Sequence, residues 1–181
     1  MADLSENLNQ LFDSGVGFEE YLGSADEVTR QKHMHYLEKM QLTEDEKKEL
    51  AESIREDREL VVFCDTYCND CRVTLALLEN LRRSAPSVGY RIVSREGNEG
   101  LMERLSGDNG IPLIVEIGEG STRNSNSGDL KGAKLIFNEF PDVLLDDMLE
   151  ADPDNKEKLI TDYRKGLYKD IMLKQIVEKL S

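Results

Sequence analysis

The order of the expected strands and helices after residue 58 constrains the fold of this chain more than any other feature. Short apolar, partly β-branched runs typical of strands occur at 60–63, 90–94, 113–117 and 134–137. Stretches with helical spacing occur at 70–83, 98–105, 143–149 and 155–180. Strands separated by helices favour parallel pairing, and two strands joined only by a loop can pair as a hairpin. The sequence therefore predicts an α/β fold with a central mixed sheet flanked by helices.

Two segments of this second part are less regular. The connection 118–132 is rich in Gly, Ser and Asn, a composition that predicts a mobile loop between two hairpin strands. The stretch 155–180 is expected to form one long helix, with Gly166 weakening its middle.

The N-terminal segment 1–57 contains no β-branched run and is typical of helices separated by turns. A first helix is expected to stop near Ser14 and Gly15. Ser24 with Glu27, and Thr43 with Glu46, each fit the capping box that begins a helix, which predicts helices at about 25–41 and 44–57. We therefore expect an N-terminal helical extension over 1–57 and a second domain over 58–181.

The charge of the chain argues against two classes of partner. The 23 Lys and Arg residues face 37 Asp and Glu, which gives a net charge of −14, and most of it lies in the segment 1–57. Phosphate-rich partners need clustered cations, so we expect no binding to nucleic acid or to a membrane surface. The sequence has neither an apolar run long enough to cross a bilayer nor the pattern of a signal peptide, so a cytoplasmic location is expected.

All three cysteines lie within eight positions, at the junction between the strand 60–63 and the helix 70–83. They are too few for a disulfide scaffold. A sulfur in the first turn of a helix faces unpaired N–H groups and the positive end of the helix dipole, which stabilise a thiolate. Cys71 lies one turn after Cys68 on the same face. This spacing suits a nucleophile, Cys68, and a resolving thiol, Cys71.

With these residues the sequence resembles the thioredoxin family over about 58–181. The residues that carry the resemblance are the strand 60–63, the segment Tyr67-Cys68-Asn69-Asp70-Cys71-Arg72, and the segment Gly110-Ile111-Pro112, which leads into the strand 113–117. It is also similar to bacterial thioredoxin-like proteins with a C-x-D-C motif. The resemblance implies a thioredoxin-like fold and a cis peptide bond at Pro112. It further implies a substrate chain that lies beside Tyr67, Ile111 and Pro112.

The sequence departs from that family at three places. Thioredoxins usually have Trp before the first cysteine of the pair, and here Tyr67 is the flat side chain in that place. The usual Gly-Pro between the cysteines is Asn69-Asp70. Many members keep a buried acid six positions before the first cysteine, where this chain has Val62.

The charges near Cys68 modulate its expected pKa in opposite directions. Asp65 and Asp70 disfavour a thiolate, whereas Arg72 and the helix start favour it. We expect a Cys68 pKa only modestly below the free value of about 8.5, and hence a reductant or mild exchanger.

Other roles for the cysteines stay open at this stage. Cys64 completes a C-x-x-x-C-x-x-C spacing that is also used to hold a four-iron cluster, but the residue before the last cysteine is Asp70 where an aromatic is usual. We expect Cys64 to end the strand as a small apolar residue, with a secondary regulatory thiol as the alternative. A zinc site needs about four ligands. The only histidines, His33 and His35, point to different sides of a helix and are expected at the surface, so no metal site is predicted.

The sequence thus predicts a thiol-disulfide oxidoreductase that needs no bound cofactor. Cys68 would attack a protein or small-molecule disulfide, and Cys71 would release the reduced product. The resemblance suggests an external reductase that returns electrons to the pair. The alternative is a binding or redox-sensing regulatory module that keeps the thioredoxin fold without turnover.

Overall fold

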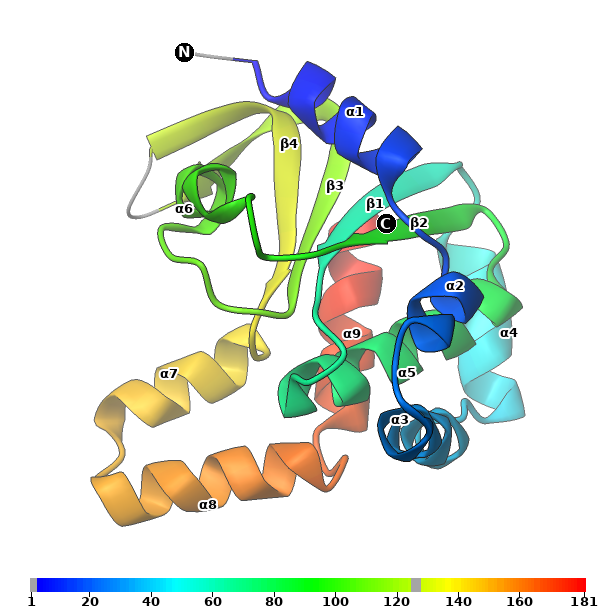
Figure 1. The fold of residues 1–181 in the computed structure, drawn as a ribbon, viewed down its shortest axis with the longest axis vertical. Coiled ribbons are helices and arrows are strands. Elements are labelled where there is room, and N and C mark those ends of the chain that lie inside the picture. The colour runs from blue at the N-terminus through cyan, green and yellow to red at the C-terminus, as the bar shows by residue number, and fades with distance from the viewer. Residues whose placement is uncertain (1–2, 125–127) are drawn as a thin grey trace.

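A four-stranded mixed sheet forms the centre of the protein, in a computed structural model that describes residues 3–124 and 128–181 (Figure 1). The strand order is β2–β1–β3–β4. β1 pairs parallel to β2 and antiparallel to β3, and β3 pairs antiparallel to β4. The bounds are Arg58–Phe63 for β1, Val88–Val93 for β2, Leu113–Asn124 for β3 and Gly128–Asn138 for β4. This arrangement confirms the predicted mixed sheet.

Helices cover both faces of the sheet, which explains why the strand 60–63 is apolar at every position. α1 (Ser5–Ser14) lies across all four strands, and α6 (Glu99–Ser106) packs on β3 and β4. α5 (Asn69–Ser84) and α9 (Lys169–Leu180) pack on the opposite face (Figure 1). The residues from Leu60 to Phe63 are accordingly 0% exposed. None of the helices in the described part of the chain has both the length and the apolarity that a membrane span requires.

The segment before β1 forms four helices that pack onto the sheet domain and share its core. After α1 come α2 (Phe18–Gly23), α3 (Glu27–Lys39) and α4 (Glu44–Ser53). The capping box of Thr43 and Glu46 is confirmed, with bonds of 3.2 and 2.8 Å. The one predicted at Ser24 is wrong, because Asp26 caps α3 by accepting the backbone N–H of Thr29 at 2.7 Å. α2 was not predicted, and the boundary at residue 57 stays a prediction.

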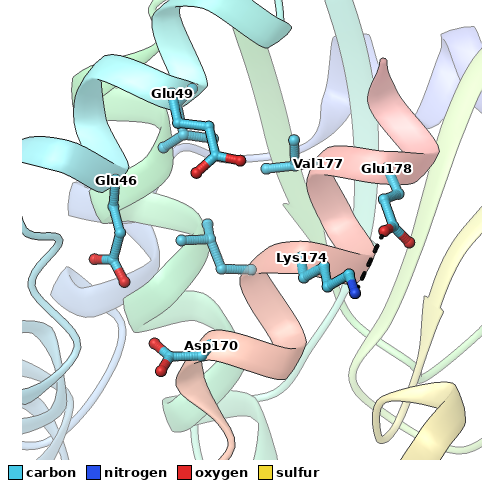
Figure 2. A pocket seen from close by; sticks show the side chains of 8 residues that line it. Glu46, Glu49, Asp170, Lys174, Val177 and Glu178 are labelled. Carbon is cyan, nitrogen blue, oxygen red and sulfur yellow. Dashed lines mark ion pairs between the residues drawn. The ribbon is translucent and has the colours of Figure 1, made fainter.

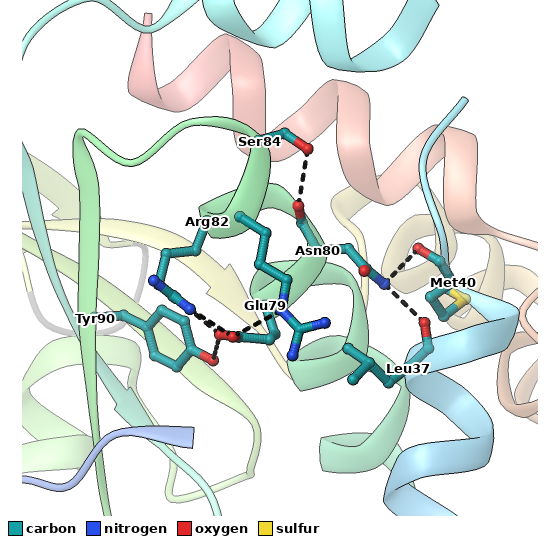
Figure 3. Close-up of polar contacts among 8 residues, drawn as sticks. Leu37, Met40, Glu79, Asn80, Arg82, Ser84 and Tyr90 are labelled. Atoms are coloured by element: carbon teal, nitrogen blue, oxygen red, sulfur yellow. Dashed lines mark hydrogen bonds and ion pairs between the residues drawn. The ribbon is translucent and has the colours of Figure 1, made fainter. Parts of the chain in front are cut away.

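Polar side chains on α5 fix the end of α3 against the central domain (Figure 3). The Asn80 amide donates to the backbone oxygens of Leu37 and Met40, at 2.9 and 3.0 Å. On the preceding residue, the buried carboxylate of Glu79 accepts the Tyr90 hydroxyl at 2.7 Å and is also paired with Arg82. These bonds hold α3, α5 and β2 in fixed relation.

The prediction of a loop over 118–132 is wrong. β3 continues to Asn124 and β4 begins at Gly128, so most of this segment belongs to a long hairpin. Residues 125–127 lie outside the described residues. The ladder between β3 and β4 supplies backbone hydrogen bonds that the Gly and Ser composition does not reveal.

The single long helix predicted at 155–180 is also wrong, because the structure has two helices there. α7 (Asp142–Glu150) is followed by α8 (Pro153–Arg164), and α9 begins only at Lys169. Gly166 separates α8 from α9 with a φ of +81°, a left-handed conformation that glycine adopts without strain. α8 lies beside α7, and after the break at Gly166 the chain returns to the sheet as α9 (Figure 1).

A shallow hollow of about 340 Å³ lies between α4 and α9 (Figure 2). Leu50, Leu173 and Val177 line it together with charged residues such as Glu49 and Lys174. Among the described residues its lining includes no cysteine, so it is separate from the site considered next.

Candidate functional site

Cys68 stands at the junction of β1 and α5, where it is the N-cap of α5. Its Sγ accepts the backbone N–H of Cys71 at 3.3 Å, as a capping side chain does. Cys68 is partly exposed, whereas Cys71 is buried directly behind it, and their side chains interact. The arrangement presents one sulfur to the outside and holds a second within reach of it.

The segment Ile111–Pro112 lies opposite Cys68. The Cys68 thiol is 3.7 Å from the backbone oxygen of Ile111, toward which it donates. The peptide bond between Ile111 and Pro112 is cis, and both residues are buried. The backbone N–H of Glu139 donates to the Pro112 oxygen at 2.7 Å, which holds this segment in place.

Tyr67 forms the exposed rim of the site, with 65% of its surface accessible. Arg95 donates to the Tyr67 hydroxyl at 3.0 Å, and that hydroxyl donates to Asp65 at 3.3 Å. Asp65 also accepts the Ser94 hydroxyl at 2.7 Å. Ser94 and Arg95, just after β2, therefore help to hold the hydroxyl end of Tyr67, while most of the residue stays exposed.

The two charged residues that flank Cys71 are each paired with another side chain. Arg72 donates to the Asn69 side chain at 2.6 Å. Asp70 is 7% exposed and forms a two-point ion pair with Arg164 on α8, at 2.8 and 3.3 Å. Sequence reasoning missed Arg164, because it lies far from Asp70 along the chain and belongs to no local motif.

The modest lowering expected for the pKa of Cys68 is wrong. Its hydrogen bond with Cys71, its burial, and the charges of Cys71 and Asp70 together raise the pKa of Cys68, and the backbone N–H of Cys71 opposes them only in part. Burial raises the pKa of Cys71 as well. In the reduced protein, both residues are therefore thiols at neutral pH.

The N-terminal helices reach the inner side of the motif. His33 is 1% exposed, so its expected surface position is wrong, whereas His35 is exposed. The His33 Nε2 lies 3.3 Å from the Thr66 oxygen, and its ring meets Tyr21 edge-on at 5.4 Å. Within residues 3–124 and 128–181, no group of three or more His, Cys, Asp or Glu residues is arranged to hold a metal ion.

Comparison with known proteins agrees with this geometry. A family model described as thioredoxin matches residues 15–127. The chain belongs to the thioredoxin family. The match begins just after α1, so it includes helices that the sequence resemblance had left outside.

Two solved structures share the thioredoxin fold of this chain over 99% of its length and 98% of theirs, at 21% identity. One is a protein of unknown function from Pseudomonas aeruginosa, with a TM-score of 0.72. The other is an HIV epitope-scaffold, with a TM-score of 0.71. No match was found among curated proteins.

Glu139 is an acid near the site that sequence reasoning also missed. Burial, together with the charges of Asp70 and Asp108, raises the pKa of Glu139. Its backbone has a φ of 65°, unusual for a residue with a side chain. By contrast, Val62 is fully buried in the sheet, where many thioredoxins have their buried acid.

Proposed function

We propose that this chain is a thiol-disulfide oxidoreductase that uses Cys68 as nucleophile and Cys71 as resolving thiol. The observation that carries the proposal is the placement of the two sulfurs. Cys68 is partly exposed at the start of α5, between the open ring of Tyr67 and the segment Ile111–Pro112, and the buried Cys71 is hydrogen-bonded to it.

The reaction follows from this placement. Cys68 loses its proton and attacks one sulfur of a disulfide in a protein or small molecule, so that a mixed disulfide forms and the other sulfur leaves as a thiol. Cys71 then attacks Cys68, which releases the second thiol and leaves the Cys68–Cys71 disulfide. Tyr67, Ile111 and Pro112 position the substrate chain. An external reductase returns two electrons to the pair, and no bound cofactor takes part.

The raised pKa of Cys68 favours the reducing direction. A strongly oxidising pair needs a stabilised thiolate in its reduced form. Here the burial of Cys68 and the charge of Asp70 disfavour that thiolate, so the disulfide is the comparatively favoured state. The rate of attack should therefore still rise with pH between 7 and 9, because the thiolate fraction grows about tenfold per unit below the pKa.

Reduction of insulin disulfides with dithiothreitol as electron donor tests the proposal. The wild-type chain should accelerate the reaction, Cys68→Ser should lose the acceleration, and Cys71→Ser should accumulate a mixed disulfide with insulin. Glu49→Gln, in the distant hollow between α4 and α9, is the matched control and should behave as wild type. Equal rates for Cys68→Ser and wild type would exclude the mechanism.

A second candidate is a binding or redox-sensing regulatory module without turnover. The apolar Val62 and the raised pKa of Cys68 favour it. The redox potential of the pair separates the two functions. A value near the roughly −270 mV of thioredoxin supports a reductant, whereas failure to form the Cys68–Cys71 disulfide supports the module. For either function we propose a cytoplasmic location, since three clustered cysteines do not make a disulfide scaffold.

A further inference from the structure

Cys64 is a third thiol next to the buried member of the pair, Cys71. It follows β1 and is 2% exposed, and its backbone N–H donates to the Val93 oxygen at 3.0 Å. Its side chain interacts with that of Cys71, whose backbone N–H donates to the Cys68 Sγ at 3.3 Å. Cys71 is therefore the shared neighbour of two sulfurs, one deeply buried and one partly exposed.

Tyr21 adds a proton donor beside this row of sulfurs. It lies on α2 and is 5% exposed, and its buried hydroxyl has no hydrogen-bond partner within the described residues. Burial raises the pKa of Tyr21 most, and among the neighbouring charges that of Cys64 contributes first. Tyr21, Cys64 and Tyr67 also line one hollow of about 550 Å³ at the edge of the sheet. The unpaired hydroxyl is thus in place to donate to a thiolate at Cys64.

We propose that Cys64 is a redox thiol that can replace Cys68 as the disulfide partner of Cys71. Cys64 loses its proton and its Sγ attacks the Sγ of Cys71. The Cys64–Cys71 bond forms as the Cys68–Cys71 bond breaks, and Cys68 leaves as a thiolate that takes up a proton. The oxidation state of the protein does not change, so the step needs no further oxidant or reductant.

The exchange gives the oxidised protein a second form. In that form the disulfide joins two buried residues, whose exposures are 2% and 0%, and an outside thiol cannot reach it easily. Cys68 becomes a free, partly exposed thiol that can form a mixed disulfide with a partner. The inference rests on the proposed function only in that both require the Cys68–Cys71 disulfide.

The sequence allows the two disulfides to be told apart. Cleavage before Asp57, Asp65, Asp70 and Asp108 places Cys64 in peptide 57–64, Cys68 in 65–69 and Cys71 in 70–107. The full-length reduced protein is oxidised with diamide and labelled in the native state with N-ethylmaleimide. It is then digested by an endoproteinase that cleaves before Asp and analysed by mass spectrometry without reduction.

The label should appear on peptide 65–69, with 57–64 linked to 70–107. Cys68→Ser should form the same link. Cys64→Ala, the matched control, should link 65–69 to 70–107 and take up no label. If wild type links 65–69 to 70–107 and peptide 57–64 is not part of any disulfide, the exchange does not occur, although the proposed function stands. If neither disulfide forms, both proposals fail.

The variant Tyr21→Phe tests whether the unpaired hydroxyl assists the exchange between the two disulfides. It removes one oxygen and keeps the ring against His33, so folding should be preserved. We expect the native labelling of Cys68 in the oxidised protein to become several-fold slower, while the Cys68–Cys71 disulfide forms at the wild-type rate. An unchanged labelling rate would overturn the role given to Tyr21.

Discussion

The hydrogen bond between Thr74 and Tyr163 ties α8 to the helix that carries the cysteines. The two hydroxyl oxygens are 2.6 Å apart, and both residues are 0% exposed. Removing one hydroxyl leaves the other buried without its partner, which costs about 1–3 kcal/mol of unfolding free energy. We therefore expect Tyr163→Phe and Thr74→Val each to destabilise the protein by about 1–3 kcal/mol.

The double variant tests whether loss of the hydrogen bond between Thr74 and Tyr163 causes the destabilisation of the single variants. Replacing both partners with apolar groups of similar shape removes the unsatisfied hydroxyl, so Thr74→Val with Tyr163→Phe should be less destabilised than the sum of the singles. Equilibrium unfolding in urea gives the four free energies that the cycle needs. Tyr36→Phe is the control, because its exposed hydroxyl donates to the Arg164 oxygen at 2.7 Å and water can replace that bond. Its effect should be within about 0.5 kcal/mol. Strict additivity of the two core changes would refute the reasoning.

The other predictions concern the charges at Cys68 and two features of the helices. Asp70→Asn should lower the pKa of Cys68, and Arg164→Gln should raise it. The pH profiles of Cys68 alkylation should therefore shift in opposite directions. Shifts of the same sign would contradict the opposite charge effects assigned to Asp70 and Arg164. Thr43→Ala should destabilise the protein by about 1 kcal/mol in urea unfolding, since it removes a capping bond. Gly166→Ala should also destabilise the protein, because φ is +81° there and a Cβ would lie 3.1 Å from the Sδ of Met40 at the end of α3. A thermal midpoint at or above that of wild type would show that the turn does not need glycine.

Local patterns were enough to predict the order of the four strands, because burial on both faces makes a strand such as 60–63 apolar throughout. They were also enough to predict most of the helices, because burial on one face spaces the apolar residues of a helix about 3.6 positions apart. The same locality explains the failures. Ser24 and Asp26 both have side chains that can cap α3, and only the path of the chain decides between them. The Gly- and Ser-rich segment at 118–132 extends a hairpin because partner strands supply its backbone hydrogen bonds. In the same way, the apolar stripe at 155–180 continues across Gly166, where the backbone turns.

The cysteine pair could be found from the sequence because its two residues lie close together in the chain. Pro112 could be found because of the family resemblance. Arg164, Glu139 and Tyr21 could not be found in this way, since each reaches the site from an element far away in sequence. The helix start favours a thiolate at Cys68, but the contact with the Cys71 sulfur, burial and the charge of Asp70 outweigh it.

The position of the N-terminal helices relative to the cysteines determines which side of the site a partner can reach. α3 packs on α5 and Tyr21 lies beside Cys64, so these helices bury the inner sulfurs. Tyr67 remains 65% exposed and Cys68 partly exposed, so the outer side remains open to a docking chain. A cover over the nucleophile would have favoured a module without turnover, and an open rim favours exchange. Control of this site by the extension would therefore act through the environment of Cys64 and Cys71, behind the nucleophile, and not by closing the entrance to it.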